Sequence, residues 1–189
     1  MKKEFRSISN MSATEDMTIE GYALKFDTFS EDLGGYIETI HKNALDETNL
    51  SDVVCLMNHD ENLVLGRTKN ETLQLTVDEI GLHFKCKLAD TQNARDLYTL
   101  VKREDVDQCS FGFFLDNKDY EMREENGVIV RHINKFLSLY DVSVVTYPAY
   151  QDTSVESRSI KEAQKEVQNF KNESRKKKLN ISIKLAHLK

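Results

Sequence analysis

Several residue types are scarce in this chain, and their scarcity limits the kinds of structure that it can form. The 189 residues include no tryptophan, one proline and three cysteines. A single proline leaves long stretches free to form regular structure, because proline interrupts helices and central strands. The cysteines, Cys55, Cys86 and Cys109, cannot all pair within one chain, and each lies in an apolar stretch. This pattern predicts reduced, packed thiols in a cytosolic setting.

Long apolar runs are absent as well. No stretch approaches the roughly 20 apolar residues of a membrane-spanning helix. The charged residues of the segment from Met1 to Arg6 are not followed by the apolar core of a secretory signal. We therefore expect neither a membrane segment nor secretion.

Common metal-binding and phosphate-binding patterns are missing. His41, His59, His83 and His132 have acidic neighbours, but no His-x-x-x-His or Cys-x-x-Cys pair occurs. The Gly34-Gly35 pair lacks the lysine of a nucleotide-binding loop. The sequence therefore predicts no metal and no cofactor.

Charge is divided unevenly along the chain. Residues 156–189 contain 10 Lys and Arg against 4 Asp and Glu, whereas residues 1–155 contain 16 against 28. An acidic body argues against nucleic-acid binding, because phosphate contacts require a cationic surface. The shift predicts two parts, a folded body over residues 1–155 and a basic tail over residues 156–189 that is helical or disordered.

Strand patterns dominate the first 155 residues. Branched and aromatic residues cluster in seven segments, namely Thr18–Phe26, Val53–Met57, Thr72–Val77, Gly81–Leu88, Ser110–Leu115, Gly127–Ile133 and Phe136–Tyr147. Turns are predicted at Asn126-Gly127 and at Asp78–Gly81.

Two helices are predicted within the body. One runs from Thr91 to Val101 with apolar residues at helical spacing and a cap at Asp90 or Thr91. The segment from His41 to Leu45 begins a second, shorter helix. Mostly antiparallel strands with a few flanking helices predict a mainly β fold, a closed or nearly closed antiparallel β-barrel.

Three residues at the edges of apolar runs form a possible nucleophilic site. Ser110 lies in Cys-Ser-Phe-Gly-Phe, His59 follows Val-Val-Cys-Leu-Met-Asn, and Asp141 begins Asp-Val-Ser-Val-Val. A histidine can remove the serine proton, and a carboxylate can fix the histidine tautomer. Strand alternation places Ser110 and Gly112 on one face, away from the aromatic face that packs in the core. Gly112 would leave room beside the hydroxyl for a substrate backbone.

Two rival assignments follow from the neighbouring residues. Cys109 is a possible nucleophile, because thiolates attack well. Alternation places it with the phenylalanines, where a thiol is an inert apolar side chain. Asp60 could orient His59, but adjacent residues on an extended chain point apart, so Asp141 is preferred.

The order and spacing of several sequence blocks resemble the prohead serine protease family of tailed phages, from about Phe5 to about Val155. The blocks are Glu20-Gly21-Tyr22-Ala23, Asn58-His59-Asp60, Leu65-Gly66-Arg67-Thr68, Ser110-Phe111-Gly112-Phe113, Asp141-Val142-Ser143-Val144-Val145 and Tyr147-Pro148-Ala149-Tyr150. The family is in turn similar to the herpesvirus capsid protease, which implies a herpesvirus-protease-like barrel.

The resemblance implies a role for each candidate residue. The histidine and serine of the family blocks correspond to His59, the base, and Ser110, the nucleophile. Asp141 occupies the acidic position directly before Val-Ser-x-Val. The loop after that strand implies oxyanion donors at the N–H groups of Ala149 or Tyr150, since proline has none.

The implied function is a serine endopeptidase that processes phage capsid and scaffold protein, with self-processing. Its partners would be the major capsid protein with its scaffold segment and further copies of itself, as a homodimer or larger homo-oligomer. It would act in the host cytoplasm, inside assembling proheads. The alternative is a catalytically silent capsid scaffold or binding module with the same fold.

Overall fold

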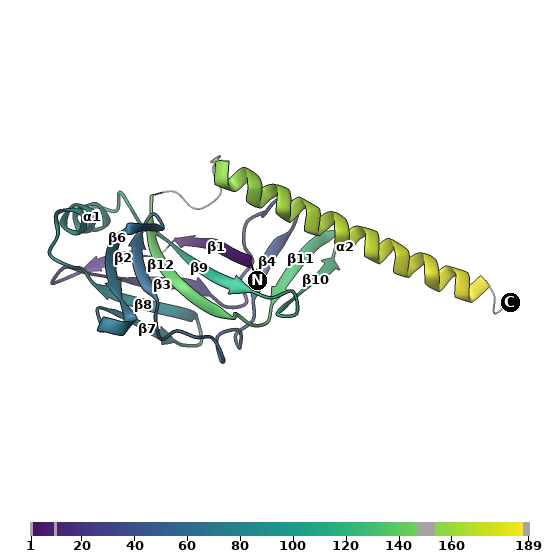
Figure 1. The fold of residues 1–189 in the computed structure, drawn as a ribbon, viewed down its shortest axis with the longest axis horizontal. Helices are drawn as coiled ribbons and strands as arrows, with labels where there is room; N and C mark the ends of the chain where they lie inside the picture. The colour runs from purple at the N-terminus through teal and green to yellow at the C-terminus, as the bar shows by residue number, and fades with distance from the viewer. Residues whose placement is uncertain (1, 10, 147–153, 187–189) are drawn as a thin grey trace.

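The computed structural model describes residues 2–9, 11–146 and 154–186, and its sheets and long C-terminal helix are shown in Figure 1. The fold is mainly β, with two α-helices in these ranges. One sheet has the order β1 (Lys2–Ser9), β9 (Gln108–Leu115), β12 (Ser138–Val145), β5 (Val54–Met57) and β6 (Asp60–Arg67). A second has the order β2 (Met11–Thr14), β3 (Thr18–Lys25), β8 (Gly81–Lys87) and β7 (Leu73–Val77). A third has the order β10 (Tyr120–Glu125), β11 (Val128–Ile133) and β4 (Ile37–Ile40).

The sheets differ in two ways from the predicted antiparallel barrel. Among the described residues, each sheet has two end strands, so the sheets do not close into a barrel, and the barrel and herpesvirus-like details are not confirmed. Pairing is also mixed, because β12 runs parallel to β5 and β11 runs parallel to β4. Local strand patterns do not specify which distant segment a strand pairs with, or in which direction.

The predicted central helix is confirmed as α1 (Gln92–Lys102). The Thr91 side chain caps it by accepting a hydrogen bond from the Ala94 N–H, at 3.3 Å. The prediction that the segment from His41 to Leu45 begins a second, shorter helix is wrong. That segment forms turns, with bonds such as Ala44 N–H to His41 C=O at 2.8 Å, and no helix continues from them. A 3-10 turn, η1 (Thr68–Asn70), follows β6.

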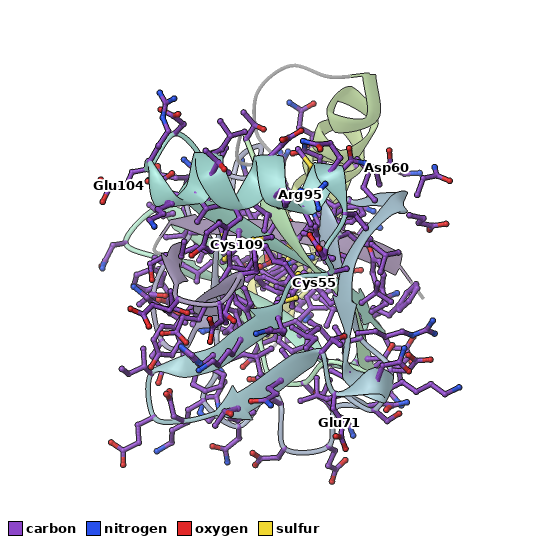
Figure 2. All side chains as sticks on the ribbon, turned by 90° about the vertical axis from the view of Figure 1, so that its left-hand side faces the viewer. Cys55, Asp60, Glu71, Arg95, Glu104 and Cys109 are labelled. Carbon is purple, nitrogen blue, oxygen red and sulfur yellow. The ribbon has the colours of Figure 1, made fainter. Side chains whose placement is uncertain are left out.

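The main core lies between the five-stranded and four-stranded sheets. Phe113 lies 5.2 Å from Phe111 and 4.9 Å from Phe136, measured between ring centroids. The three cysteines are fully buried there as free thiols. Figure 2 shows Cys55 and Cys109 among the interior side chains, with charged groups at the periphery. The predicted packed thiols are confirmed.

A charged network fixes β1 against the three-stranded sheet. Arg131, whose side chain is 1% exposed, donates to Glu38 and Glu4, with its Nε 2.6 Å from Glu38 Oε2. Arg6 donates to the same two carboxylates, over 2.8 Å to Glu38 Oε1 and 2.6 Å to Glu4 Oε2. Charges this deeply buried are tolerated only when paired. Glu4 and Arg6 come from β1, Glu38 from β4 and Arg131 from β11, so the network joins three strands.

The second α-helix, α2 (Ser154–Ala186), lies against the body near its start and then extends past it (Figure 1). Val167 is buried in a small apolar cluster with Leu33, Tyr36 and Ile129. Further along, Leu179, Ile181 and Ile183 are exposed. Neither helix in the described ranges combines the length and apolar character that a membrane span needs. The division of the chain after residue 155 stays a prediction.

Candidate active site

Two neighbouring strands present small and polar side chains on the same face of the five-stranded sheet. In the antiparallel pairing of β9 with β12, Ser110 lies opposite Ser143, and Gly112 lies opposite Asp141. Alternation sends the intervening Cys109, Phe111 and Phe113 into the core. The predicted orientation of Ser110 away from the core face is therefore confirmed.

His59 is held at the tip of the hairpin that joins β5 to β6. Met57 pairs with Asp60, so the loop has two residues, Asn58 and His59, with φ of 52° and 56°. Two positive φ values are the mark of a type I′ turn, and Asn tolerates this conformation better than most residues. Asn58 also ties the tip to the chain at the end of β12, with its N–H bound to Val144 C=O at 2.8 Å and its Oδ1 accepting from Thr146 N–H at 3.1 Å.

The tip brings His59 between the other two predicted residues. Its Nε2 lies 2.7 Å from Ser110 Oγ, and its Nδ1 lies 2.7 Å from Asp141 Oδ1. Both distances are those of good hydrogen bonds. Ser110 and Asp141 are 0% and 1% exposed, whereas the His59 side chain is 18% exposed. The three residues predicted from distant segments therefore form one continuous chain of polar contacts.

Aromatic rings pack around the contacts of Ser110, His59 and Asp141. Phe5, on β1, lies edge-on to the imidazole of His59, with ring centroids 4.2 Å apart. Tyr140, the neighbour of Asp141, covers Gly112, where an added methyl group would be 2.3 Å from its Cζ. Burial, followed by the charge of Asp141, raises the pKa of Tyr140, so the phenol stays protonated. The space above Gly112 is therefore filled by Tyr140 and Asp141, and its interpretation as room for a substrate backbone is wrong.

The rival residues have other contacts. Cys109 Sγ donates to the Tyr22 carbonyl at 3.0 Å, and burial raises the pKa of the thiol to about 12. A thiol protonated at neutral pH is a poor nucleophile. Asp60 accepts from the backbone N–H and the side-chain amide of Asn62, both at 2.9 Å, and no bond joins it to His59 among the described contacts.

The remaining predictions concern a metal site and the oxyanion donors. In the ranges that the structure describes, no three His, Cys, Asp or Glu side chains are grouped so as to hold a metal ion. Ala149 and Tyr150, the predicted oxyanion donors, lie outside the described residues. Phe5 and Ser143 were not foreseen, although Ser143 shares the strand face of Asp141 by simple alternation.

The hydrogen-bonded order of serine, histidine and aspartate is the arrangement that serine proteases of several folds use for nucleophilic catalysis. The chain belongs to the caudovirus prohead serine protease family, whose model matches residues 3–167, and the predicted family is confirmed. It is also 25% identical over 154 residues to a protein named "Prohead protease" from Escherichia phage T5. That match covers 79% of this chain and 66% of the relative, so the chain spans just under two thirds of the relative's length. The comparison with solved structures finds no match.

Proposed function

We propose that this chain is a serine endopeptidase that processes phage capsid and scaffold protein during prohead maturation. One observation carries the proposal, namely the two 2.7 Å contacts that join Ser110 to His59 and His59 to Asp141. Membership of the prohead protease family supports both the reaction class and its setting.

The geometry supports a specific division of roles. With its Nδ1 proton donated to Asp141, His59 presents the lone pair of Nε2 to the Ser110 hydroxyl. Ser110 Oγ attacks the peptide carbonyl as Nε2 takes its proton, and the imidazolium returns that proton to the leaving amine. Water then attacks the acyl-enzyme by the reverse relay, which frees Ser110. N–H groups of Ala149 and Tyr150 remain the proposed oxyanion donors.

The proposed substrates follow from the family. The capsid protein and its scaffold segment are the expected targets, and self-processing of the chain is expected as well. The setting is the assembling prohead in the host cytoplasm, and the proposed assembly is a homodimer or a larger homo-oligomer. The similarity to the T5 protein named prohead protease supports this setting.

A fluorophosphonate probe tests the proposal directly, because it forms a covalent bond only with an activated serine. Labelling should map to Ser110 by peptide mass spectrometry. Ser110→Ala should abolish labelling and lower processing of co-expressed capsid protein by up to about 10⁶-fold. Cys109→Ala is the matched control: it should lower stability through a small cavity while labelling persists.

Each outcome of this test has a clear meaning. Processing by a folded Ser110→Ala chain at the wild-type rate would refute the serine mechanism. Absence of labelling in the folded, assembled wild-type chain would favour the catalytically silent scaffold.

A further inference from the structure

The proposed reaction gives no role to the buried hydroxyl of Ser143. Ser143, on β12, is 0% exposed, and its Oγ donates to Asp141 Oδ1 over 2.9 Å. Asp141 Oδ1 also lies 2.7 Å from His59 Nδ1. Asp141 Oδ1 therefore has two donors, one from its own strand and one from the β5–β6 hairpin.

The strand geometry holds the Ser143 hydroxyl in place. Residues two apart on a strand share a face, so Ser143 and Asp141 are neighbours on the catalytic face. β12 is an interior strand, and Ser143 is paired with Ser110 of β9 on one side and Leu56 of β5 on the other. Its backbone is thus fixed on both edges, and its hydroxyl does not depend on a mobile loop.

A second donor matters because an aspartate side chain has a weakly defined terminal torsion. The Cβ–Cγ bond of Asp has broad minima, and an ionised carboxylate can only accept hydrogen bonds. If Oδ1 were bound by His59 alone, this oxygen could shift and tilt the imidazole away from Ser110. The Ser143 bond fixes Oδ1 from a direction that does not involve the histidine. On the other side, Oδ2 would be 2.7 Å from a methyl group at Gly112, so that side is closely packed.

We propose that Ser143 is a positioning residue that holds the Asp141 carboxylate in the orientation His59 requires. It acts through Asp141 and makes no contact with the substrate. The inference rests on the proposed function, because the rate it sustains is the reaction of Ser110.

The test compares the second-order rate of fluorophosphonate labelling of Ser110 in the wild-type chain and in Ser143→Ala. The substitution removes only a hydroxyl, so the strand should persist, and an unfolding temperature measured in parallel checks this. Loss of one hydrogen bond to a charged group should lower the labelling rate about 10- to 100-fold. Val101→Ala, on α1, is the control: it should lower the unfolding temperature by shrinking a core side chain and leave the labelling rate near that of the wild type.

A double-mutant cycle separates positioning from a general structural effect. If Ser143 acts only through Asp141, the Ser143→Ala change should cost no further rate in an Asp141→Ala background. A structural effect would lower the rate by the same factor in both backgrounds. Equal factors would overturn the inference, as would an unchanged rate in the single variant.

The outcomes for the two proposals are distinguishable. A wild-type chain that does not label at Ser110 refutes the proposed function, and the inference falls with it. A wild-type chain that labels, beside a folded Ser143→Ala chain that labels equally fast, refutes the inference alone.

Discussion

At the scale of single residues, Gly112 determines how closely the Asp141 carboxylate can approach β9, the strand that carries Ser110. A methyl group at this position would lie 2.3 Å from Tyr140 Cζ and 2.7 Å from Asp141 Oδ2, much closer than van der Waals contact. The positions of Tyr140 and Asp141 therefore both depend on a residue without a side chain. A glycine in the middle of β9 weakens the strand in general terms, but here it is required by what lies above it.

We expect Gly112→Ala to lower the fluorophosphonate labelling rate of Ser110 at least tenfold and to reduce the unfolding temperature. The reason is that the new methyl group must push Asp141 away from His59, or Tyr140 out of its packing. Gly127→Asn is a suitable control, because Gly127 lies in a hairpin turn with nothing within 4 Å of an added Cβ. A folded Gly112→Ala chain that labels at the wild-type rate would show that the carboxylate tolerates displacement.

At the scale of elements, β1 is held by charged contacts in addition to its strand pairing with β9. Burial alone would raise the pKa of Glu4, but the charges of Arg6 and Arg131 and the hydrogen bonds from both outweigh it and lower this pKa to about 2. A carboxyl whose pKa is lower in the folded chain binds protons more readily when unfolded. Its contribution to stability is therefore present above the unfolded value of 4.5 and is lost as the pH falls toward 2.

We expect the free energy of unfolding to fall between pH 4.5 and pH 2, and part of that dependence to vanish in Glu4→Gln. At pH 7 the same variant should be less stable than the wild type, because it leaves the buried guanidinium of Arg131 with one charged partner fewer. Denaturant titrations at several pH values measure both effects. Glu79→Gln, at an exposed turn, serves as the control, and an equal acid dependence in both variants would contradict this role of Glu4.

The strands and helices differ in how far they can be predicted from the sequence. The seven segments predicted as strands each overlap a strand of the structure, and α1 with its Thr91 cap is also confirmed, because period and capping are local properties. Five strands of the described residues were not predicted, namely β1, β2, β4, β6 and β10. Of these, β1 and β10 are rich in charged residues, which obscures a strand pattern. Arg6 and Glu4 of β1 are paired with Glu38 and Arg131, which lie in distant parts of the chain.

The candidate site was predictable to a similar extent. Ser110, His59 and Asp141 could be named from their sequence blocks, and the structure brings them together. The hydroxyl of Ser143 and the ring of Phe5 were missed, since their roles depend on which strands become neighbours. The occupants of the space above Gly112 were misjudged for the same reason.

At the scale of the whole molecule, α2 has two parts with different surroundings. Up to Phe170 it contributes apolar side chains to the cluster around Tyr36, and Glu166 lies 3.9 Å from Arg131. Beyond that point it carries the run Arg175-Lys176-Lys177-Lys178 and the exposed Leu179 and Ile181. The first part packs on the body, whereas the basic side chains of the second are exposed. For this second part we propose a partner of opposite charge, such as an acidic scaffold segment.

We expect a chain that ends at Asn172 to keep the wild-type unfolding temperature and labelling rate but to be depleted in purified proheads. A chain that ends at Val155 should be less stable, because it exposes Leu33 and Ile129 where Val167 now covers them. If the depletion reflects charge, docking of the full-length chain should weaken as salt rises, since exposed charges are screened beyond about 10 Å at 0.1 M salt. Equal incorporation of the full-length and shortened chains would leave the second part of α2 without a role in packaging.

The sheet order also determines when the contacts of the candidate site can form during synthesis. The contacting residues of the site are 51 and 82 positions apart, and β12 lies between the strand of the nucleophile and the strand that leads to the base. Contacts of such long sequence separation close late, because a large loop must first lose its freedom. A nascent chain therefore has no complete relay until β12 has left the ribosome and inserted between its neighbours. The contacts of Ser110 and Asp141 with His59 are therefore a property of the paired sheet and not of any one segment of the chain.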